Sequence, residues 1–298
     1  MRSRYLAVLL LSLLALAAQA KVDPVSEDLS SIDKDYPPAV EEFSVTVDGQ
    51  KMPALIYLAN GAGPHPTVLL LHGFPGNEKS LDIAQAIRRA GFNAVFFNYR
   101  GAWGAQGNYR LTQQPGDVLA VLNFLREPVN ADRYRVRGDR LSTLGHSMGG
   151  YAALASAARD PALRCVGTMS AVNLAIWAQG IRDDAPSIKG FLDYADTLFM
   201  LSDYNGKTMS DELAGIDPSS VDSRNFTPGL RGKYVLMVAG SSDKVTPPAL
   251  MHEPVIKRYQ AETGIQLTHH LIPGDHSYSW TRIQLTRLVM DWLERDCR

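Results

Sequence analysis

Apolar positions along this chain follow two spacings, one typical of buried strands and one typical of helices. Short continuous apolar runs recur, and most are followed by a stretch in which apolar residues return at helical intervals. The runs predict strands at 67–71, 93–98, 140–144, 165–170, 234–239 and 267–272, and the stretches predict helices at 81–89, 116–125, 151–159 and 283–293. Strands that alternate with helices predict a parallel sheet covered on both faces, with right-handed connections.

A β-hairpin is expected ahead of this series. Residues 42–47 alternate polar and apolar side chains, and residues 52–58 resume the pattern after Asp48-Gly49. Asp-Gly is a pair typical of tight hairpin turns. The sheet is therefore expected to be mostly parallel, with a hairpin at its start.

Residues 171–233 interrupt the alternation of strands and helices. They are rich in Asp, Ser, Tyr and Met and contain no clear strand. We interpret them as a mostly helical insertion over one end of the sheet, with the cap at about 173–229 and the core at about 41–172 and 230–298. The predicted fold class is α/β, a mostly parallel central sheet with helices on both faces and a helical cap insertion.

The first twenty residues have the layout of a signal peptide. Arg2 and Arg4 precede an apolar run at 5–16, and small residues follow up to Ala20. The run is shorter than the ~20 residues that span a bilayer. We expect cleavage after Ala20 and, because Lys21 rather than a cysteine comes next, no lipid anchor. The mature chain is expected to be periplasmic or secreted, without a stable membrane anchor.

Composition and charge are those of an ordinary globular enzyme. The chain has 298 residues, 45% of them hydrophobic and 20% charged, which is enough for one large core and an insertion. Its formal net charge of -1 gives no basic excess, so a nucleic-acid partner is not expected. The oligomeric state stays open.

Ser147 is the candidate nucleophile. It lies in GHSMG, between a predicted strand and a predicted helix, and glycines on both sides of it allow a turn sharp enough to expose the hydroxyl. Such a motif occurs by chance in roughly one chain in ten of this length, so its place at the strand-to-helix junction carries the inference. A serine hydroxyl also needs a base, and its product oxyanion needs donors.

His276 and Asp243 are the candidate base and acid. Each follows a later predicted strand, and the carboxyl ends of parallel strands meet at one edge of a sheet. Asp243 would accept the Nδ1 hydrogen of His276 and leave Nε2 free to take the serine proton. Asp217 and Asp222 are rival acids in the insertion, but no strand precedes them.

Other histidines and Asp275 are expected to have structural roles. Asp275 adjoins His276 and could hardly turn back to orient it, His72 suits a loop role, and His269 and His270 face opposite sides of a predicted strand. No spacing here matches a metal site. We expect neither a metal ion nor a cofactor.

Two backbone N–H groups are the candidate oxyanion donors. One belongs to Met148, directly after the candidate nucleophile, and the other to Phe74, in the loop HGFPG after the first buried strand. Backbone donors are rigid and already oriented, so they stabilise the developing charge with little reorganisation.

Cys165 and Cys297 are the only cysteines in the sequence. Both positions belong at the end of the predicted sheet opposite the candidate site, and an oxidising compartment would permit them to pair. A disulfide and two separate thiols both remain open.

Five segments, HGFPG, YRGAWG, GHSMGG, GSSDKVTPP and GDHS, together resemble the α/β-hydrolase superfamily. The likeness is strongest to dienelactone hydrolases and to the catalytic domains of serine aminopeptidases and prolyl oligopeptidases, and it covers nearly the whole mature chain. It implies that Ser147, Asp243 and His276 form a catalytic triad. Dienelactone hydrolases use a cysteine nucleophile, and prolyl oligopeptidases carry a β-propeller for which this chain has no room.

The leading hypothesis is an exported serine hydrolase that cleaves a small-molecule carboxylic ester through an acyl-enzyme. Alternatives are a serine peptidase, aminopeptidase or amidase, an acyltransferase, and a non-catalytic binding protein. Residues that could hold the amine of an aminopeptidase substrate are Asp183, Asp184, Asp193 and Asp196. Aromatic residues that could line an apolar substrate pocket are Trp103, Tyr109, Trp177, Phe191, Tyr194 and Phe199.

Overall fold

A computed structural model describes residues 22–298 of the chain. The expected signal peptide and its cleavage site after Ala20 lie outside the described residues. Within residues 22–298, no helix is both long enough and apolar enough to cross a membrane.

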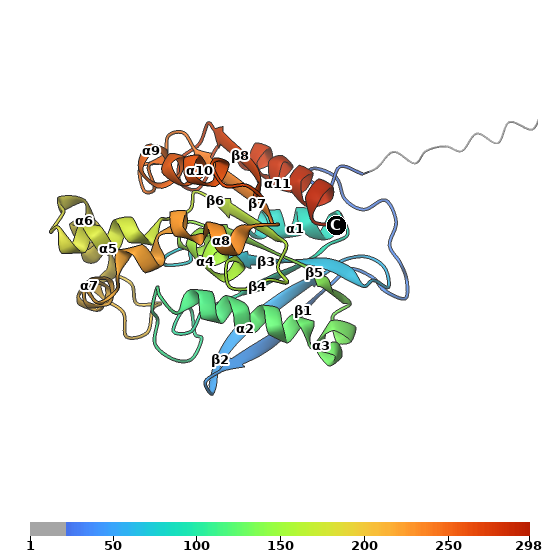
Figure 1. Ribbon diagram of the computed structural model, residues 1–298. Helices are drawn as coiled ribbons and strands as arrows, with labels where there is room; N and C mark the ends of the chain where they lie inside the picture. The colour runs from blue at the N-terminus through green and yellow to red at the C-terminus, as the bar shows by residue number, and fades with distance from the viewer. Residues whose placement is uncertain (1–21) are drawn as a thin grey trace, which may run out of the picture.

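An eight-stranded sheet forms the centre of the molecule, in the order β1-β2-β4-β3-β5-β6-β7-β8 (Figure 1). Only β2 runs against its neighbours, and all other pairs from β4 to β8 are parallel. The strands are β1 (Ala39–Val47), β2 (Gln50–Leu58), β3 (His65–Leu71), β4 (Asn93–Phe97), β5 (Val136–His146), β6 (Cys165–Met169), β7 (Tyr234–Gly240) and β8 (Gln266–Ile272). This confirms the predicted mostly parallel sheet.

The hairpin at the start of the sheet is also as predicted. Its turn residues have φ of 51° at Asp48 and 77° at Gly49. Two positive φ values in succession are what a two-residue turn between right-twisted strands requires, and Asp-Gly adopts them at low cost.

Helices cover both faces of the sheet. On one face, apolar residues of α1 (Leu81–Arg89) and α11 (Arg282–Asp296) share a buried cluster with β4 and β7. On the other face, α2 (Gln114–Arg126), α4 (Met148–Ala157) and α10 (Glu253–Gln260) contribute to a second and larger cluster. The central strands β4 and β6 are buried along their whole length, which explains their continuous apolar runs.

Three short helices were not predicted from the apolar spacing. They are α3 (Pro128–Arg133), α9 (Pro248–Met251) and the helix α10 described above. Each carries a proline in its first turn, where the missing N–H costs nothing. All three are too short to show a clear helical period.

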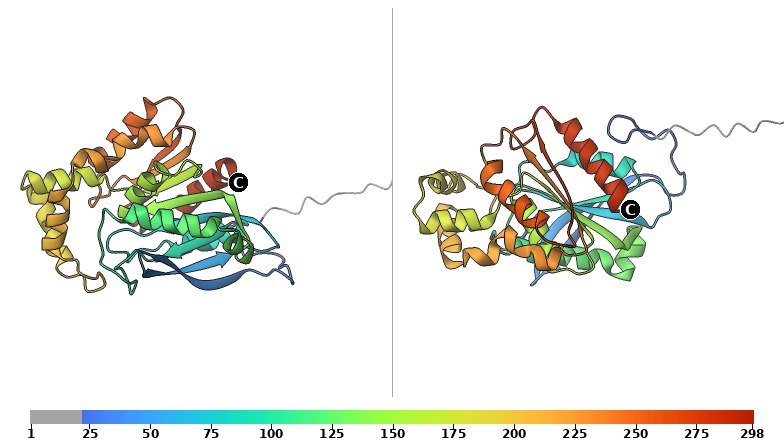
Figure 2. Two further views of the ribbon diagram at one scale, coloured as in Figure 1. Left: turned by 60° about the horizontal axis from the view of Figure 1, so that its bottom comes forward. Right: turned by 45° about the horizontal axis from the view of Figure 1, so that its top comes forward.

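A helical cap lies beyond one end of the sheet, as Figure 2 shows. Its elements are α5 (Leu174–Arg182), α6 (Pro186–Ala195), α7 (Gly206–Gly215) and the 3-10 turn η1 (Pro218–Val221). The 3-10 turn η2 (Ser223–Phe226) and α8 (Thr227–Leu230) then lead back along α4, where Gly229 packs against Ala158. Main-chain hydrogen bonds join the cap to the loop after β4, for example from Ser202 N to Gly101 O at 2.7 Å and from Trp103 N to Met200 O at 2.9 Å. The predicted helical insertion is therefore present.

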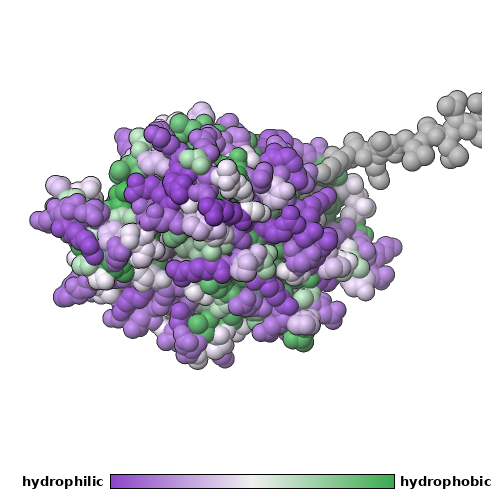
Figure 3. Space-filling model, in the orientation of Figure 1, coloured by the Kyte–Doolittle hydropathy of each residue, from purple (hydrophilic) through white to green (hydrophobic). Residues whose placement is uncertain are grey.

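Cys165 and Cys297 form a disulfide between the start of β6 and the residue after α11, with Cα atoms 5.9 Å apart. The bond lies at the amino ends of the parallel strands, as expected. On the face drawn in Figure 3, hydrophilic residues predominate and hydrophobic ones form scattered patches.

Candidate active site

Ser147 occupies a strained turn between β5 and α4. Its φ of 55° and ψ of -119° are unusual for a residue with a side chain, and such strain persists only where the surroundings enforce it. The main chain of Ser147 is fixed on both sides, since its N–H donates to Met169 O and its carbonyl accepts from Val172 N. The hydroxyl is carried at the carboxyl edge of the sheet and faces a cavity.

Glycines around Ser147 have a steric reason. A Cβ at Gly145 would collide with the carbonyl group of Gly149, and a Cβ at Gly149 would collide with the carbonyl group of Leu71. A Cβ at Gly73 would lie only 2.9 Å from Ser147 Cβ. These glycines therefore let the ends of β3 and β5 and the start of α4 approach one another closely.

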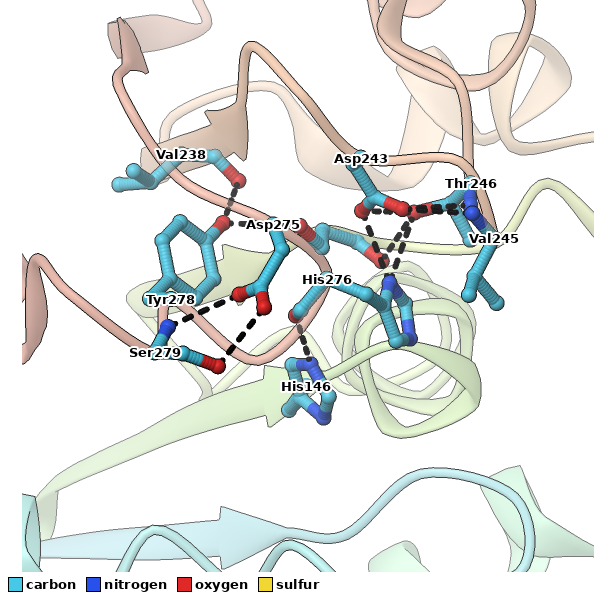
Figure 4. Close-up of polar contacts among 10 residues, drawn as sticks. His146, Val238, Asp243, Val245, Thr246, Asp275, His276, Tyr278 and Ser279 are labelled. Carbon is cyan, nitrogen blue, oxygen red and sulfur yellow. Dashed lines mark hydrogen bonds and ion pairs between the residues drawn. The ribbon is translucent and has the colours of Figure 1, made fainter.

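His276 and Asp243 meet across two loops at the same edge of the sheet (Figure 4). His276 Nδ1 lies 2.8 Å from Asp243 Oδ2. Because a carboxylate only accepts hydrogen bonds, Nδ1 is the donor, and Nε2 of the neutral ring is left as an acceptor. This is the pairing expected from the sequence, and His276 lines the same cavity as Ser147.

Asp243 is held as an anion by its surroundings. Oδ1 accepts from the N–H groups of Val245 and Thr246 at 2.8 and 2.9 Å, and Oδ2 also accepts from Thr246 Oγ1 at 2.7 Å. Burial raises the pKa of Asp243, but the hydrogen bonds from His276 and Thr246 outweigh it and lower the pKa to about 2. Asp243 is therefore charged at neutral pH.

Two residues near this pair were not singled out from the sequence. Thr246 supplies a side-chain and a main-chain donor to Asp243. His146 places Nε2 2.8 Å from the carbonyl oxygen of His276, with the two rings 4.7 Å apart. The Asp-x-x-Thr spacing after a strand is a local turn signal that could have identified Thr246. No comparable signal exists for His146, because its partner lies 130 residues away.

The candidate oxyanion donors flank the serine. Met148 begins α4, and Phe74 follows Gly73, whose main chain packs against Ser147. Within residues 22–298, no main-chain carbonyl accepts a hydrogen bond from the N–H of either residue. Free N–H groups beside the hydroxyl are what an oxyanion site requires.

A cavity of about 480 Å³ opens in front of Ser147 and His276. Of the predicted pocket residues, Trp177, Phe191 and Tyr194 line it, and Phe74 adds a fourth aromatic ring. Its polar lining includes Asn77, Glu78, Ser187 and Lys244. The cap therefore contributes three aromatic rings and Ser187, while Asn77, Glu78 and Lys244 come from loops outside the cap.

Three of the predicted pocket residues do not line this cavity. Phe199 is 92% exposed, since it follows the end of α6 and points away from the core. Tyr109 is fully buried behind Phe74 and accepts a hydrogen bond from Gln114. Trp103 donates from Nε1 to Pro75 O at 2.8 Å and so braces the loop after β3. These three assignments were wrong because aromatic character does not reveal which way a ring faces.

The rival acids have other partners. Asp217 caps η1, and Asp222 is bound by Arg224 and Asn173. Asp275 accepts from the N–H and hydroxyl of Ser279, which is the predicted loop role.

None of the four insertion aspartates proposed to hold an amine lines the cavity. Asp183 accepts from Gln179, Asp193 from Lys189, and Asp196 from Gly206 N. The acidic residue that does line the cavity, Glu78, was missed by the sequence analysis.

The remaining histidines are away from the reaction centre or packed beneath it. His72 is buried and its Nδ1 lies 2.8 Å from Gly73 O, while burial lowers its pKa to about 4. His269 is exposed and contacts Gln260, and His270 is half-buried on β8. Among the described residues, no group of three or more His, Cys, Asp or Glu is placed to hold a metal ion.

A family comparison matches most of this chain. The model of the family described as "Putative esterase" matches residues 44–291. Among curated proteins, 2,6-dihydropseudooxynicotine hydrolase of Paenarthrobacter nicotinovorans is 31% identical over 131 residues, which are 42% of this chain and 34% of that enzyme. The matched segment is thus about a third of the length of that relative.

Solved structures of the same fold include Est1E and an acylaminoacyl peptidase. Est1E from Butyrivibrio proteoclasticus has a TM-score of 0.61 and 18% identity, over 85% of this chain and 97% of its own. The acylaminoacyl peptidase of Pyrococcus horikoshii has a TM-score of 0.66 and 13% identity, over 87% of this chain and 42% of its own. At such identities the likeness establishes the fold alone. Since the family model covers most of the chain, the protein belongs to the Esterase family and has the α/β-hydrolase fold.

Proposed function

We propose that the protein is an exported serine hydrolase that cleaves carboxylic esters of small molecules. One observation carries the proposal: the buried Asp243 carboxylate orients His276 at the edge of the cavity that Ser147 also faces. Membership of the Esterase family supports the ester class. Asp243 is the positioning acid, His276 the base and Ser147 the nucleophile.

The proposed reaction has two halves. Ser147 Oγ attacks the acyl carbon while His276 Nε2 takes the hydroxyl proton, and that proton then passes to the departing alcohol. In the second half, Nε2 takes a proton from water, the water oxygen attacks the acyl-enzyme, and the proton returns to Ser147 Oγ as the carboxylic acid leaves. The N–H groups of Phe74 and Met148 stabilise the oxyanion in both halves.

An ester substrate is favoured over a peptide with a free amino terminus. The aspartates of the insertion that could bind an amine do not line the cavity, and the carboxylate that does, Glu78, has the Arg282 guanidinium 3.7 Å away. The part of the lining that the cap supplies includes the rings of Trp177, Phe191 and Tyr194, which suit an apolar acyl or alcohol group.

Two features support the proposed export: the signal-peptide layout of the first twenty residues and the disulfide. Disulfides persist in oxidising compartments and are rare in the cytosol, so the bond between Cys165 and Cys297 supports a periplasmic or secreted location. N-terminal sequencing of the protein from a periplasmic or culture fraction should begin at Lys21. An N-terminus at residue 1 in a cytosolic fraction would contradict export.

Fluorophosphonate labelling of the purified mature protein tests the nucleophile. Wild type should label and Ser147→Ala should not, because the hydroxyl oxygen forms the covalent bond. A panel of esters of increasing acyl length, with aminoacyl anilides beside it, then separates ester from amide cleavage. Hydrolysis of the anilides with little turnover of any ester would replace the esterase proposal by a peptidase. Addition of alcohol or amine acceptors with product analysis separates hydrolysis from acyl transfer.

A further inference from the structure

His146 connects the candidate nucleophile to the candidate base. It is the last residue of β5 and directly precedes Ser147, and its Nε2 donates to the carbonyl oxygen of His276 at 2.8 Å. Figure 4 draws the ring of His146 beneath the loop that carries His276. The residue that precedes the nucleophile is therefore bonded to the main chain of the base.

The protonation state of His146 is set by its surroundings. A carbonyl oxygen can only accept, so Nε2 carries the hydrogen. The side chain is 5% exposed, and burial together with the nearby His276 lowers its pKa to about 3. His146 is thus a neutral donor at working pH, and no group in residues 22–298 is hydrogen-bonded to its buried Nδ1. It is poorly suited to act as a second base, since its one accepting nitrogen is enclosed.

Other contacts hold the loop between β8 and α11 on either side of His276. Gly274 O accepts from Ser242 N at 2.9 Å, and Tyr278 Oη donates to Val238 O at 3.0 Å. Among the described residues, the donor to the carbonyl of His276 itself is His146. The peptide that sets the direction of the His276 side chain therefore depends on this bond.

We propose that His146 is a positioning residue for the reaction proposed above: by holding the main chain of His276, it keeps Nε2 of the base aimed at Ser147. The inference rests on the proposed function, since it needs His276 to be the base. Asp243 controls rotation of the imidazole from one side. His146 controls the place of the backbone from which the imidazole projects, and it does so from the residue next to the nucleophile.

A pair of variants of equal length tests the bond itself. His146→Gln keeps an amide donor near the position of Nε2, while His146→Met fills the space without a donor. We expect His146→Met to lower kcat by about 100-fold, the loss that a misplacement near 1 Å can cause, with KM changed by less than about threefold. His146→Gln should stay within about tenfold of wild type, and its acid limb of kcat/KM should not move because His146 is uncharged there.

Two further variants control for folding. His146→Asn keeps a polar group that does not reach the carbonyl, so its kcat should fall as far as that of His146→Met. It replaces His146→Met in the comparison if that variant folds poorly. His65→Gln alters another buried histidine, whose Nε2 and Nδ1 lie 3.0 Å from Gly61 O and 3.2 Å from Gly91 O at the far end of β3. It should lower the melting temperature and leave kcat unchanged.

The results separate this inference from the proposed function. If Ser147→Ala still hydrolyses esters, the proposed function fails whatever His146 does. If Ser147→Ala is inactive but His146→Met and His146→Asn keep wild-type kcat, the positioning role is wrong. Equal losses in the Gln, Met and Asn variants with melting temperatures like that of wild type would also overturn it, because the donor would then be irrelevant.

Discussion

The edge of the sheet that carries Ser147 and the cap beside it are held in different ways. At the edge, main-chain atoms approach so closely that a Cβ on Gly149 has no room. In the cap, a Cβ on Gly190 would meet no atom within 4 Å, and α6 buries only two of its ten residues. The difference teaches that backbone packing determines the geometry of the reaction, whereas exposed helix side chains determine the shape of the cavity. Chemistry and substrate choice should therefore be separable by mutation.

Asp243→Asn should have the largest effect on the reaction at the edge of the sheet. An amide cannot hold His276 in the required tautomer, so kcat should fall by about 10⁴-fold, as it does for the equivalent change in a serine protease. Asp222→Asn is the matched control, since Asp222 was a rival acid and bonds to Asn173 and Arg224 instead. Steady-state kinetics with one ester measure both. Comparable losses in the two variants would show that Asp243 has no special role.

Two glycine-to-alanine changes compare the two regions directly. Gly149→Ala should lower the free energy of unfolding by about 3 kcal/mol, because the methyl group collides with the main chain of Leu71 and His72. Gly190→Ala should raise it by up to about 1 kcal/mol, because alanine favours the helix and the site is open. Urea unfolding monitored by circular dichroism measures both. A tolerated Gly149→Ala would contradict the tight packing at the edge.

Cap side chains should alter substrate choice and leave the chemistry intact. Phe191 lines the cavity and packs on Trp177 with ring centroids 4.7 Å apart. Phe191→Ala should raise KM about tenfold for bulky acyl esters, which corresponds to part of one buried ring, and change KM for an acetyl ester little. Phe199→Ala removes an exposed ring outside the cavity and should leave both values unchanged. An equal effect of both variants on KM would contradict the role of the cap in substrate binding.

Acid should destabilise the edge before it affects the cap, which contains no histidine from residue 173 to residue 229. Burial lowers the pKa of His72 to about 4, against 6.5 for the free side chain, so the unfolded chain takes up a proton that the folded chain excludes. The contribution of His72 to the free energy of unfolding is therefore complete above about pH 7 and falls as the pH drops below 6.5.

His72 alone should lower the free energy of unfolding by about 1 kcal/mol between about pH 6.5 and about pH 5.5. Urea unfolding at several pH values gives the free energy of unfolding as a function of pH. The slope of this dependence should be shallower for His72→Gln than for wild type. Parallel slopes would mean that His72 titrates normally in the folded protein.

Local patterns were sufficient for the sheet and for the main residues of the candidate site. The helix expected at 81–89 is α1 with the same bounds, because its apolar spacing and the following glycine are both local signals. Ser147, Asp243 and His276 could be placed from their positions after strands, since parallel strands end at one edge.

The cavity lining and the role of His146 could not be predicted in the same way. Whether Phe191 or Phe199 faces inward depends on how the cap docks, and the docking bonds join segments about 100 residues apart, such as Glu212 with Leu111 and Thr112. The bond from His146 to His276 likewise exists only once β5 and the loop after β8 are folded together. Non-local contacts of this kind leave no periodic signal in the sequence.

Rapid-quench mass spectrometry with a p-nitrophenyl ester tests the central claim most directly. Wild type should release about one equivalent of p-nitrophenol in a burst and carry the acyl mass on the peptide that contains Ser147, as expected for acylation faster than deacylation. Ser147→Ala should show neither the burst nor the adduct. Steady hydrolysis by wild type with the acyl group on another residue, or an undiminished burst in Ser147→Ala, would contradict the proposed mechanism.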